Sequence, residues 1–204
     1  MKRTLILCAA AASVLSLAAC NKQDTSNPGQ SEPVNKVQDA TAAAVGATSA
    51  ATLGANTLGG YVSNAAMGDM YEIEAGKIAQ EKAQNADVKA FGAMLVKDHT
   101  ASSTEMKPLV TAAGETPPTE LDERRKGMLD NLRAASGADF DKTFLTQQEA
   151  AHNEALTLHK GYADNGENAQ LKAFAAKTAP VIQAHLDQVK KLQGGAGGAM
   201  AEHK

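Results

Sequence analysis

Aromatic residues are scarce in this sequence. They make up 3% of its 204 residues, and tryptophan is absent. Hydrophobic residues nevertheless reach 43%, with alanine abundant among them, and small aliphatic side chains suit closely packed helices better than a β-sheet. No segment shows the sustained alternation of apolar and polar residues, with β-branched side chains, that a half-buried strand requires. The composition therefore predicts an all-α protein.

Cysteine and an excess of basic charge are also missing. The sequence has two cysteines, Cys8 and Cys20, too few for a disulfide framework. It has 20 Lys and Arg against 23 Asp and Glu, a formal net charge of −3, so nucleic acid is not an expected partner. We find no nucleophile elbow, phosphate-binding loop or Ser/His/Asp arrangement. An enzyme is the less favoured class, and redox catalysis on a bound metal is the only form that stays open.

The N-terminus follows the pattern of a bacterial lipoprotein signal. Met1–Arg3 is short and basic, and Thr4–Leu17 is apolar but too short for a membrane span. The sequence Leu-Ala-Ala-Cys that ends at Cys20 resembles a lipobox, in which cleavage before the cysteine leaves its thiol to carry lipid. We expect residues 1–19 to be the signal peptide and Cys20 to hold the protein on a membrane through its lipid. An ordinary secretory signal that happens to contain a cysteine is the alternative.

The residues after Cys20 bear on location and flexibility. In lipoprotein sorting, a residue other than Asp at the position of Asn21 usually implies the outer membrane. The resemblance therefore implies a lipid anchor on the periplasmic side of that membrane, in the cell envelope. Residues 20–60 are polar at first and then rich in Ala, Thr, Gly and Ser, and we expect a flexible linker with at most a transient helix over Asp39–Ala51. Residues 194–204 are expected to form a flexible tail.

Helical patterns fill residues 61–193, which we take as the folded domain. Breaks at Asn85-Ala86 and Asn165-Gly166 each separate two long segments, and Asn168 can cap the last of them. After each break the sequence repeats, because NADVKAFGA and NAQLKAFAA match at six of nine positions, which favours a duplicated helical hairpin. Two hairpins predict an up-down-up-down four-helix bundle with an extra short helix in the crossover. The expected long helices are Tyr61–Gln84, Asp87–Ala113, Ala138–Asp164 and Ala169–Gln193, and the short one is Thr119–Ala135.

Each long helix carries a polar group on its apolar stripe. Glu72 lies in a seam of small residues, and His99 follows Leu95 on an apolar face. His152 and His185 have comparable positions on the third and fourth long helices. At 1.5 Å rise per residue, Glu72, His99 and His152 lie roughly 20 Å from the nearer turn, and His185 lies about one helical turn deeper. We therefore predict that one acid and three imidazoles face a shared interior.

Three imidazoles and a carboxylate form a plausible shell for a transition metal. Zn, Fe or Cu is the expected cofactor, and Ni is also compatible. Glu149 joins the candidate ligands because Glu149-Ala-Ala-His152 is a Glu-x-x-His motif, whose spacing puts both groups on one face. A di-iron site of the ferritin type needs a second such pair, but the matching positions hold Val96 and Ile182. A standard di-iron oxidase site is therefore excluded.

The same residues also allow an interpretation without metal. A buried pair of Glu72 with His99 would satisfy both groups by hydrogen bonding. Glu74 is the alternative to Glu72, because a second possible face of that helix would turn it inward. His159 is expected near the surface, at the end of the bundle.

Several stretches also carry a resemblance: GDMYEIEAGKIAQ, VKAFGAMLVKDHT, SGADFD and LKAFAAKTAPVIQAHL. Together they resemble a bacterial family known as domain of unknown function 4142, whose members are often labelled outer membrane proteins. The resemblance spans about Tyr61–Leu192 and implies a ferritin-like helical bundle. It matches the family's helix-one acid to Glu72 and its histidines to His99, His152 and His185. An alanine precedes His152 where many relatives have Asp, which weakens any role that needs a carboxylate there. The family name supplies no activity.

Two functions follow from these observations. The first is a lipid-anchored periplasmic bundle that binds a transition metal through its inward His/Glu cluster, with a role in envelope stress or metal handling. The second is a structural or partner-binding module of the cell envelope, whose outer face binds another envelope protein without any metal.

Overall fold

Every regular element in the described part of the chain is a helix. The computed structural model describes residues 32–51 and 53–199, and no strand occurs among them. The all-α prediction is confirmed for these residues. None of their helices is both long and apolar enough to pass through a bilayer. The predicted signal peptide, residues 1–19, and the predicted lipid site at Cys20 lie outside the described residues.

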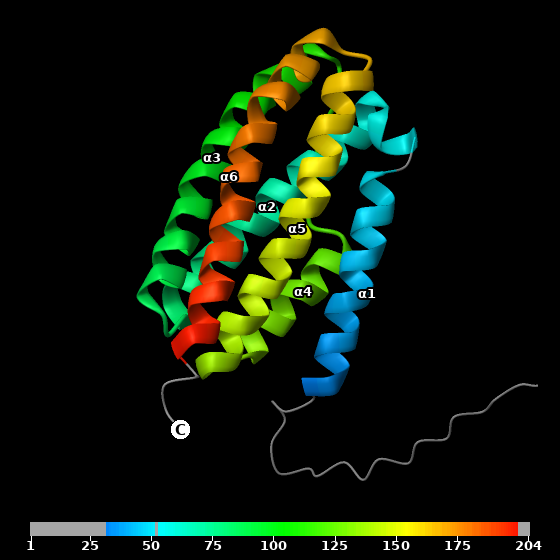
Figure 1. Cartoon of the computed structure of the whole chain (residues 1–204). Coiled ribbons are helices and arrows are strands. Elements are labelled where there is room, and N and C mark those ends of the chain that lie inside the picture. Colours follow the sequence, from blue (N-terminus) through cyan, green and yellow to red (C-terminus); the bar gives the residue numbers. More distant parts are fainter. Residues whose placement is uncertain (1–31, 52, 200–204) are drawn as a thin grey trace, which may run out of the picture. The chain divides into compact units, whose positions relative to one another are not determined.

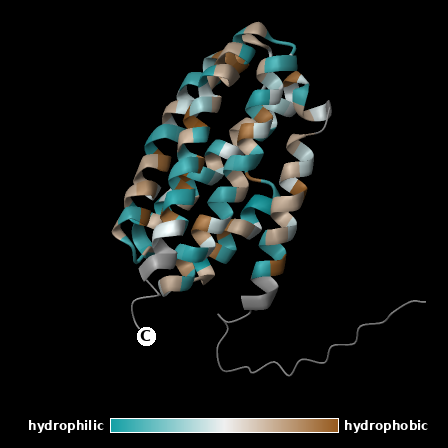
Figure 2. Ribbon diagram, viewed as in Figure 1, coloured by the Kyte–Doolittle hydropathy of each residue, from teal (hydrophilic) through white to brown (hydrophobic). Residues whose placement is uncertain are grey.

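Four long helices pack around a common interior. The helix α2 packs on α3 and α5, and α6 packs on the same two helices from the other side (Figure 1). Hydrophobic residues are interspersed with hydrophilic ones along each of them, as a helix with one buried face requires (Figure 2). The elements of the described residues are α1 Glu32–Ala50, η1 Leu53–Asn56, α2 Leu58–Lys82, α3 Ala86–Ala112, α4 Glu123–Ala134, α5 Gly137–Asn165 and α6 Ala169–Ala199.

Polar side chains fix where the helices begin. The side chain of Asn85 accepts a hydrogen bond from the Asp87 amide at 2.7 Å and begins α3. The predicted cap at Asn168 is confirmed, because its Oδ1 accepts from the amide of Leu171 at 3.1 Å. Asp122 caps α4 by accepting from the Arg125 amide at 2.7 Å, so this helix begins later than the sequence pattern suggested. Each cap satisfies amides that have no partner inside the helix.

Glycine brings α2 and α3 into close contact. A Cβ atom on Gly76 would lie 2.6 Å from the carbonyl oxygen of Gly92, and one on Gly92 would lie 2.8 Å from that of Gly76. The two backbones therefore touch where any other residue would hold them apart. This contact accounts for the seam of small residues along α2.

The buried apolar residues form two separate clusters. One contains Phe91, Leu95 and Phe144, and the other contains Met106 and Leu158. On α3, α5 and α6, the chain passes from one cluster to the other through a buried polar segment. Buried polar or charged residues are Asp69, Glu72, His99, Arg125, Asn131, Gln147, Gln148, His152, Glu154, His159 and His185. A polar layer therefore divides the core, and most of the predicted site residues lie in it.

The helix α1 occupies residues that the sequence assigned to a flexible linker. It packs on α5 and α4, and the linker prediction is wrong over residues 32–50. Large apolar groups contribute little to this packing; the buried residues include Ala42 and Ala50. The Asp39 carboxylate instead accepts hydrogen bonds from Asn131 Nδ2 at 2.7 Å and from Gln147 Nε2 at 2.8 Å. Such tertiary polar contacts leave no periodic signal in the sequence of α1.

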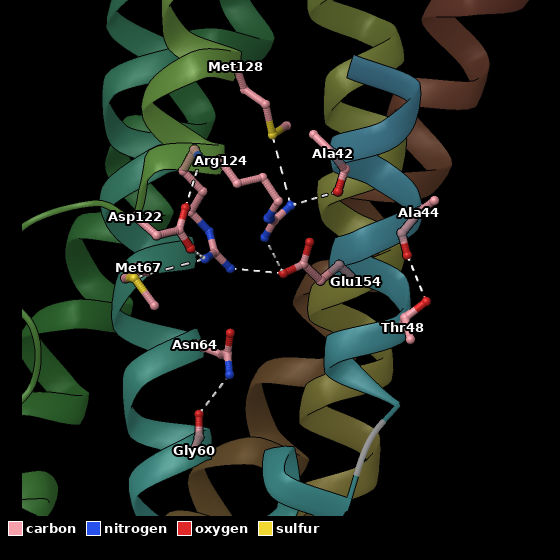
Figure 3. Close-up of polar contacts among 11 residues, drawn as sticks. Ala42, Ala44, Thr48, Gly60, Asn64, Met67, Asp122, Arg124, Met128 and Glu154 are labelled. Atoms are coloured by element: carbon pink, nitrogen blue, oxygen red, sulfur yellow. Dashed lines mark hydrogen bonds and ion pairs between the residues drawn. The ribbon is translucent and has the colours of Figure 1, made fainter. Parts of the chain in front are cut away.

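A buried charge cluster joins α4 and α5 beneath α1. Glu154 Oε1 accepts from Arg124 Nη2 and from Arg125 Nη2, each at 2.8 Å. Arg124 Nη1 also donates to the carbonyl of Ala42 in α1 at 3.2 Å, and Figure 3 shows Arg124 lying between Glu154 and α1. Arg125 Nη1 pairs with Asp122 at 2.5 Å. The cluster contains equal numbers of guanidinium and carboxylate groups, which allows its burial.

The last helix is also longer than expected. α6 continues to Ala199, through residues that the sequence assigned to a flexible tail from position 194. It is anchored by buried Leu192 and by Gln193, whose Nε2 donates to Glu149 Oε2 at 2.9 Å. Residues 200–204 lie outside the described part.

We expect Gly76→Ala to destabilise the protein by roughly 1–3 kcal/mol, because the new methyl group forces α2 and α3 apart. Gly68→Ala is the matched control on the same helix, since nothing lies within 4 Å of its Cβ position. The control should gain about 0.5–1 kcal/mol from the better helix former. Urea unfolding midpoints measure both effects. Equal stability of the two variants would contradict the close contact of the backbones.

Candidate metal centre

Three histidines from three helices meet in the polar layer. His99 on α3, His152 on α5 and His185 on α6 are all buried. One ring nitrogen of each lies within 4.8 Å of the corresponding nitrogen of the other two. The prediction that these rings share one interior level is therefore supported, and no helical turn separates His185 from the others. Helical side chains lean toward the N-terminus of their helix, so His152 leans away from the α5–α6 turn and His185 toward it, which closes the expected offset.

Each imidazole is held from outside by one acceptor. His99 Nδ1 lies 2.8 Å from Asp69 Oδ1, and His152 Nδ1 lies 2.8 Å from the backbone carbonyl of Gln148. His185 Nε2 lies 3.1 Å from Asp98 Oδ2. A carbonyl or carboxylate can only accept, so the nitrogen facing it carries the hydrogen. These contacts fix which nitrogen of each neutral ring is left with a lone pair.

The opposite nitrogens have no partner. They are His99 Nε2, His152 Nε2 and His185 Nδ1, and each is buried without a hydrogen bond in the described structure. A buried polar atom without a partner costs about 1–3 kcal/mol. Three such atoms within 4.8 Å of one another form a set of lone pairs that a cation would satisfy together. Outer acceptors of this kind are the usual support of metal-binding histidines.

Glu72 lies beside this group rather than within it. Its Oε1 is 3.8 Å from His152 Nδ1, too far for a hydrogen bond, and its Oε2 is buried without a partner. Both atoms of the Gln148 side-chain amide are also unpartnered. The alternative acid, Glu74, lies on the outside of α2 and pairs with Lys77 at 2.6 Å. Of the two acids considered from the sequence, Glu72 is the one that faces the interior.

A small cavity of about 60 Å³ adjoins these groups. Its lining includes Glu72 and the three histidines, together with Arg124, Arg125 and Glu154. A single water needs about 10–15 Å³ when volume is measured this way. The cavity can therefore hold an ion and a few waters, but it is too small for a large organic ligand.

Burial determines the charge of two of the rings. It lowers the pKa of His152 to about 3, with smaller effects from His99 and His185. Burial also lowers the pKa of His185, and the charge of His99 acts in the same direction. Burial opposes protonation of His99 as well, but its hydrogen bond to Asp69 and the charge of Glu72 raise its pKa overall. His152 and His185 are thus neutral at pH 7 and able to bind a cation without first losing a proton.

Two sequence expectations fail at this level. Glu149 does not join the cluster, since its carboxylate is held by Gln193 and it does not line the cavity. The i,i+3 spacing places it near His152 on α5 but turns it toward the edge of α6. His159 is buried rather than near the surface, and its Nδ1 is 3.0 Å from the Tyr61 hydroxyl. The Tyr61 hydroxyl gives this buried ring a hydrogen-bond partner inside the protein.

Two acids that hold histidines were not among the predicted site residues. Asp69 lies one helical turn before Glu72, and its Oδ2 also accepts from Ser103 Oγ at 3.1 Å. Asp98 directly precedes His99 in the sequence, but its carboxylate contacts His185 on α6. The sequence could have indicated Asp69, because its spacing from Glu72 puts both acids on one face of α2. No pattern in the sequence indicates that Asp98 of α3 contacts His185 of α6.

Glu72→Gln should change how stability depends on pH in the metal-free protein. Burial raises the pKa of Glu72 from 4.5 to about 7, with His99 opposing the shift. The folded state therefore holds a proton that the unfolded state releases, and stability falls as pH rises from about 4.5 through about 7. Relative to the variant, the wild type should lose up to about 3 kcal/mol over this range. Urea titrations with a chelator present at a series of pH values measure the difference.

The control for this experiment is Glu74→Gln, which alters an exposed carboxylate on the same helix. It should leave the pH profile parallel to that of the wild type. If Glu72→Gln also ran parallel, Glu72 would not be a buried, desolvated acid.

The comparisons with known proteins agree with the resemblance seen in the sequence. No curated protein matches the chain, and no solved structure matches it. The family described as Domain of unknown function (DUF4142) matches residues 42–192. This range includes the three histidines, Glu72 and both supporting acids, as well as the end of α1. The protein is therefore a member of the DUF4142 family.

Proposed function

We propose that the protein binds one transition-metal ion through His99, His152 and His185. The observation that carries the proposal is the convergence of three buried, unpartnered ring nitrogens. Hydrogen bonds from outside hold each ring in the tautomer that a metal ligand needs. A purely structural network would have turned these nitrogens toward partners, because leaving them bare is costly.

Glu72 supplies the negative charge for this site. Its unpartnered oxygen is buried in the same cavity, and a carboxylate there would lower the cost of burying a divalent cation. Zn, Fe and Cu are the ions that three imidazoles and a carboxylate suit best. Since Val96 and Ile182 stand where a second Glu-x-x-His pair would need glutamate, the proposed site is mononuclear.

We further propose that the four long helices form a ferritin-like bundle. Their order is up-down-down-up rather than the up-down-up-down order expected from the sequence, because the N-terminal halves of α3 and α5 share one apolar cluster and their C-terminal halves share the other (Figure 1). The short α2–α3 and α5–α6 connections make each pair an antiparallel hairpin. The longer connection between the hairpins contains α4, which packs on α2 and α5. Metal ligands on facing helices are a common feature of such bundles.

The proposed location is the periplasmic side of the outer membrane. The lipobox-like sequence that ends at Cys20 and the polar residues after it support a lipid anchor. The most fitting role in that compartment is handling of transition metal, including its buffering during envelope stress. An envelope protein is the class of partner that fits this location.

Metal binding is tested on protein produced without a histidine tag. Metal-free protein titrated with Co²⁺ should bind one equivalent, and His152→Gln should weaken binding by about 100-fold or more. His159→Gln is the matched control, because His159 is also buried on α5 but pairs with Tyr61. It should retain the affinity of the wild type.

Thermal melts of both variants check that they fold. A wild type that binds neither Co²⁺, Zn²⁺ nor Cu²⁺, and whose melting temperature ignores all three, would leave the structural or partner-binding module as the better explanation.

The lipid anchor is tested by Cys20→Ala in the full-length chain. The wild type, expressed in a bacterium and labelled with a fatty-acid analogue, should carry the label and sediment with membranes. The variant should carry no label and appear in the soluble periplasmic fraction. Cys8→Ala is the control, because the expected cleavage removes that residue. Labelling of the Cys20 variant would exclude this residue as the lipid site.

A further inference from the structure

A surface groove runs between α3 and α6 and reaches the proposed metal site from outside. It has a volume of about 700 Å³, and Asp87, Met94 and Asp98 line it on the α3 side, while Ala184 and His185 line it on the α6 side. The inner cavity shares three lining residues with this groove: Asp98, Val181 and His185. These three residues are therefore the wall between the groove and the cavity.

His185 presents a different nitrogen to each space. Its Nε2 is 3.1 Å from Asp98 Oδ2, and its Nδ1 is the buried, unpartnered atom that joins the other two histidines. The side chain of Asp98 is 30% exposed, whereas that of His185 is 4% exposed. A carboxylate in contact with solvent is thus joined by one hydrogen bond to a buried ligand.

The charge of the groove favours a cation. Its lining has two carboxylates, Asp87 and Asp98, and no Lys or Arg. On α4 the inner cavity is lined by Arg124 and Arg125, which both pair with Glu154, so this part of the lining has no excess of negative charge to attract a cation. Where α2 meets α3, the contact of Gly76 with Gly92 leaves no space between the backbones.

We propose that divalent cations reach the three-histidine site through the α3–α6 groove, with Asp98 as the capturing carboxylate and the His185–Val181 wall as the gate. This inference rests on the proposed metal binding and adds the route to it. Asp98 attracts the hydrated ion at the surface, and His185 takes it over through the nitrogen that faces inward. The ion loses its waters as it passes the wall.

Blocking the groove tests the route directly. Ala184 is exposed and lines the groove, so Ala184→Trp should slow both association and dissociation of Co²⁺ by about tenfold or more. Its Kd should stay within a few-fold of the wild-type value, because an obstacle on the route changes both rates together. Ala173→Trp is the matched control, since Ala173 is exposed on α6 but does not line the groove. Stopped-flow loading and chelator-induced release measure the two rates.

Substitutions of Asp98 and Asp69, the two acids that hydrogen-bond to histidines, distinguish capture of the ion from support of a histidine ring. Asp98→Asn should slow association, and the loss should shrink at high salt, because electrostatic capture at an exposed charge is screened. Asp69→Asn should leave association unchanged and speed dissociation, because Asp69 is buried and its carboxylate accepts hydrogen bonds from His99 and Ser103. Melting temperatures of both variants report any loss of fold.

The outcomes distinguish the two proposals. If the wild type binds no Co²⁺, metal binding itself fails. If the wild type binds Co²⁺ but Ala184→Trp and Asp98→Asn load at the wild-type rate, the metal site stands and the route through the groove is wrong.

Discussion

The structure depends on one constraint: three imidazoles are buried in a layer that offers each of them only one hydrogen-bond partner. Asp69, the Gln148 carbonyl and Asp98 supply those partners from outside the group. The remaining nitrogens have nothing to bond except what enters between them. Burial keeps the pKa of His152 near 3, so this ring does not gain a proton near neutral pH. The apolar clusters above and below the layer keep water from filling it freely.

The small side chains that dominate the composition make this arrangement possible. The backbones of α2 and α3 come into contact where Gly76 lies against Gly92. Because these helices are so close, side chains from α2 and α3 can meet in the interior. Phe91 packs directly against His152 and His185, with ring centroids 6.3 and 6.2 Å apart, so one apolar ring covers the histidine group on the side of the first cluster.

The sequence predicted the parts of the fold that depend on local patterns. Asn85 and Asn168 sit where helix caps are needed. Counting residues from each turn placed His99 and His152 near the middle of their helices, which is one level although the two turns lie at opposite ends of the bundle. Counting along helix axes misplaced His185 because it ignores the direction in which side chains lean. The helix α1 was missed because Asp39 is held by Asn131 and Gln147, which are distant in the sequence. The spacing of Glu149 from His152 predicted a shared face, but a helical face is wide enough for one group to point inward and the other toward a neighbouring helix.

The two supporting carboxylates are chemically identical, and their surroundings give them different roles. Asp69 is buried, accepts hydrogen bonds from His99 and Ser103, and so orients the His99 ring and raises its pKa. Asp98 forms the same kind of bond with His185, but it does so at the boundary with a groove open to solvent. A closed site made only of buried acids would bind a cation tightly and exchange it slowly, because each ion would have to wait for helices to separate. In the proposed metal site, the hydrogen bond between partly exposed Asp98 and buried His185 would provide a side on which an ion is exchanged without unfolding.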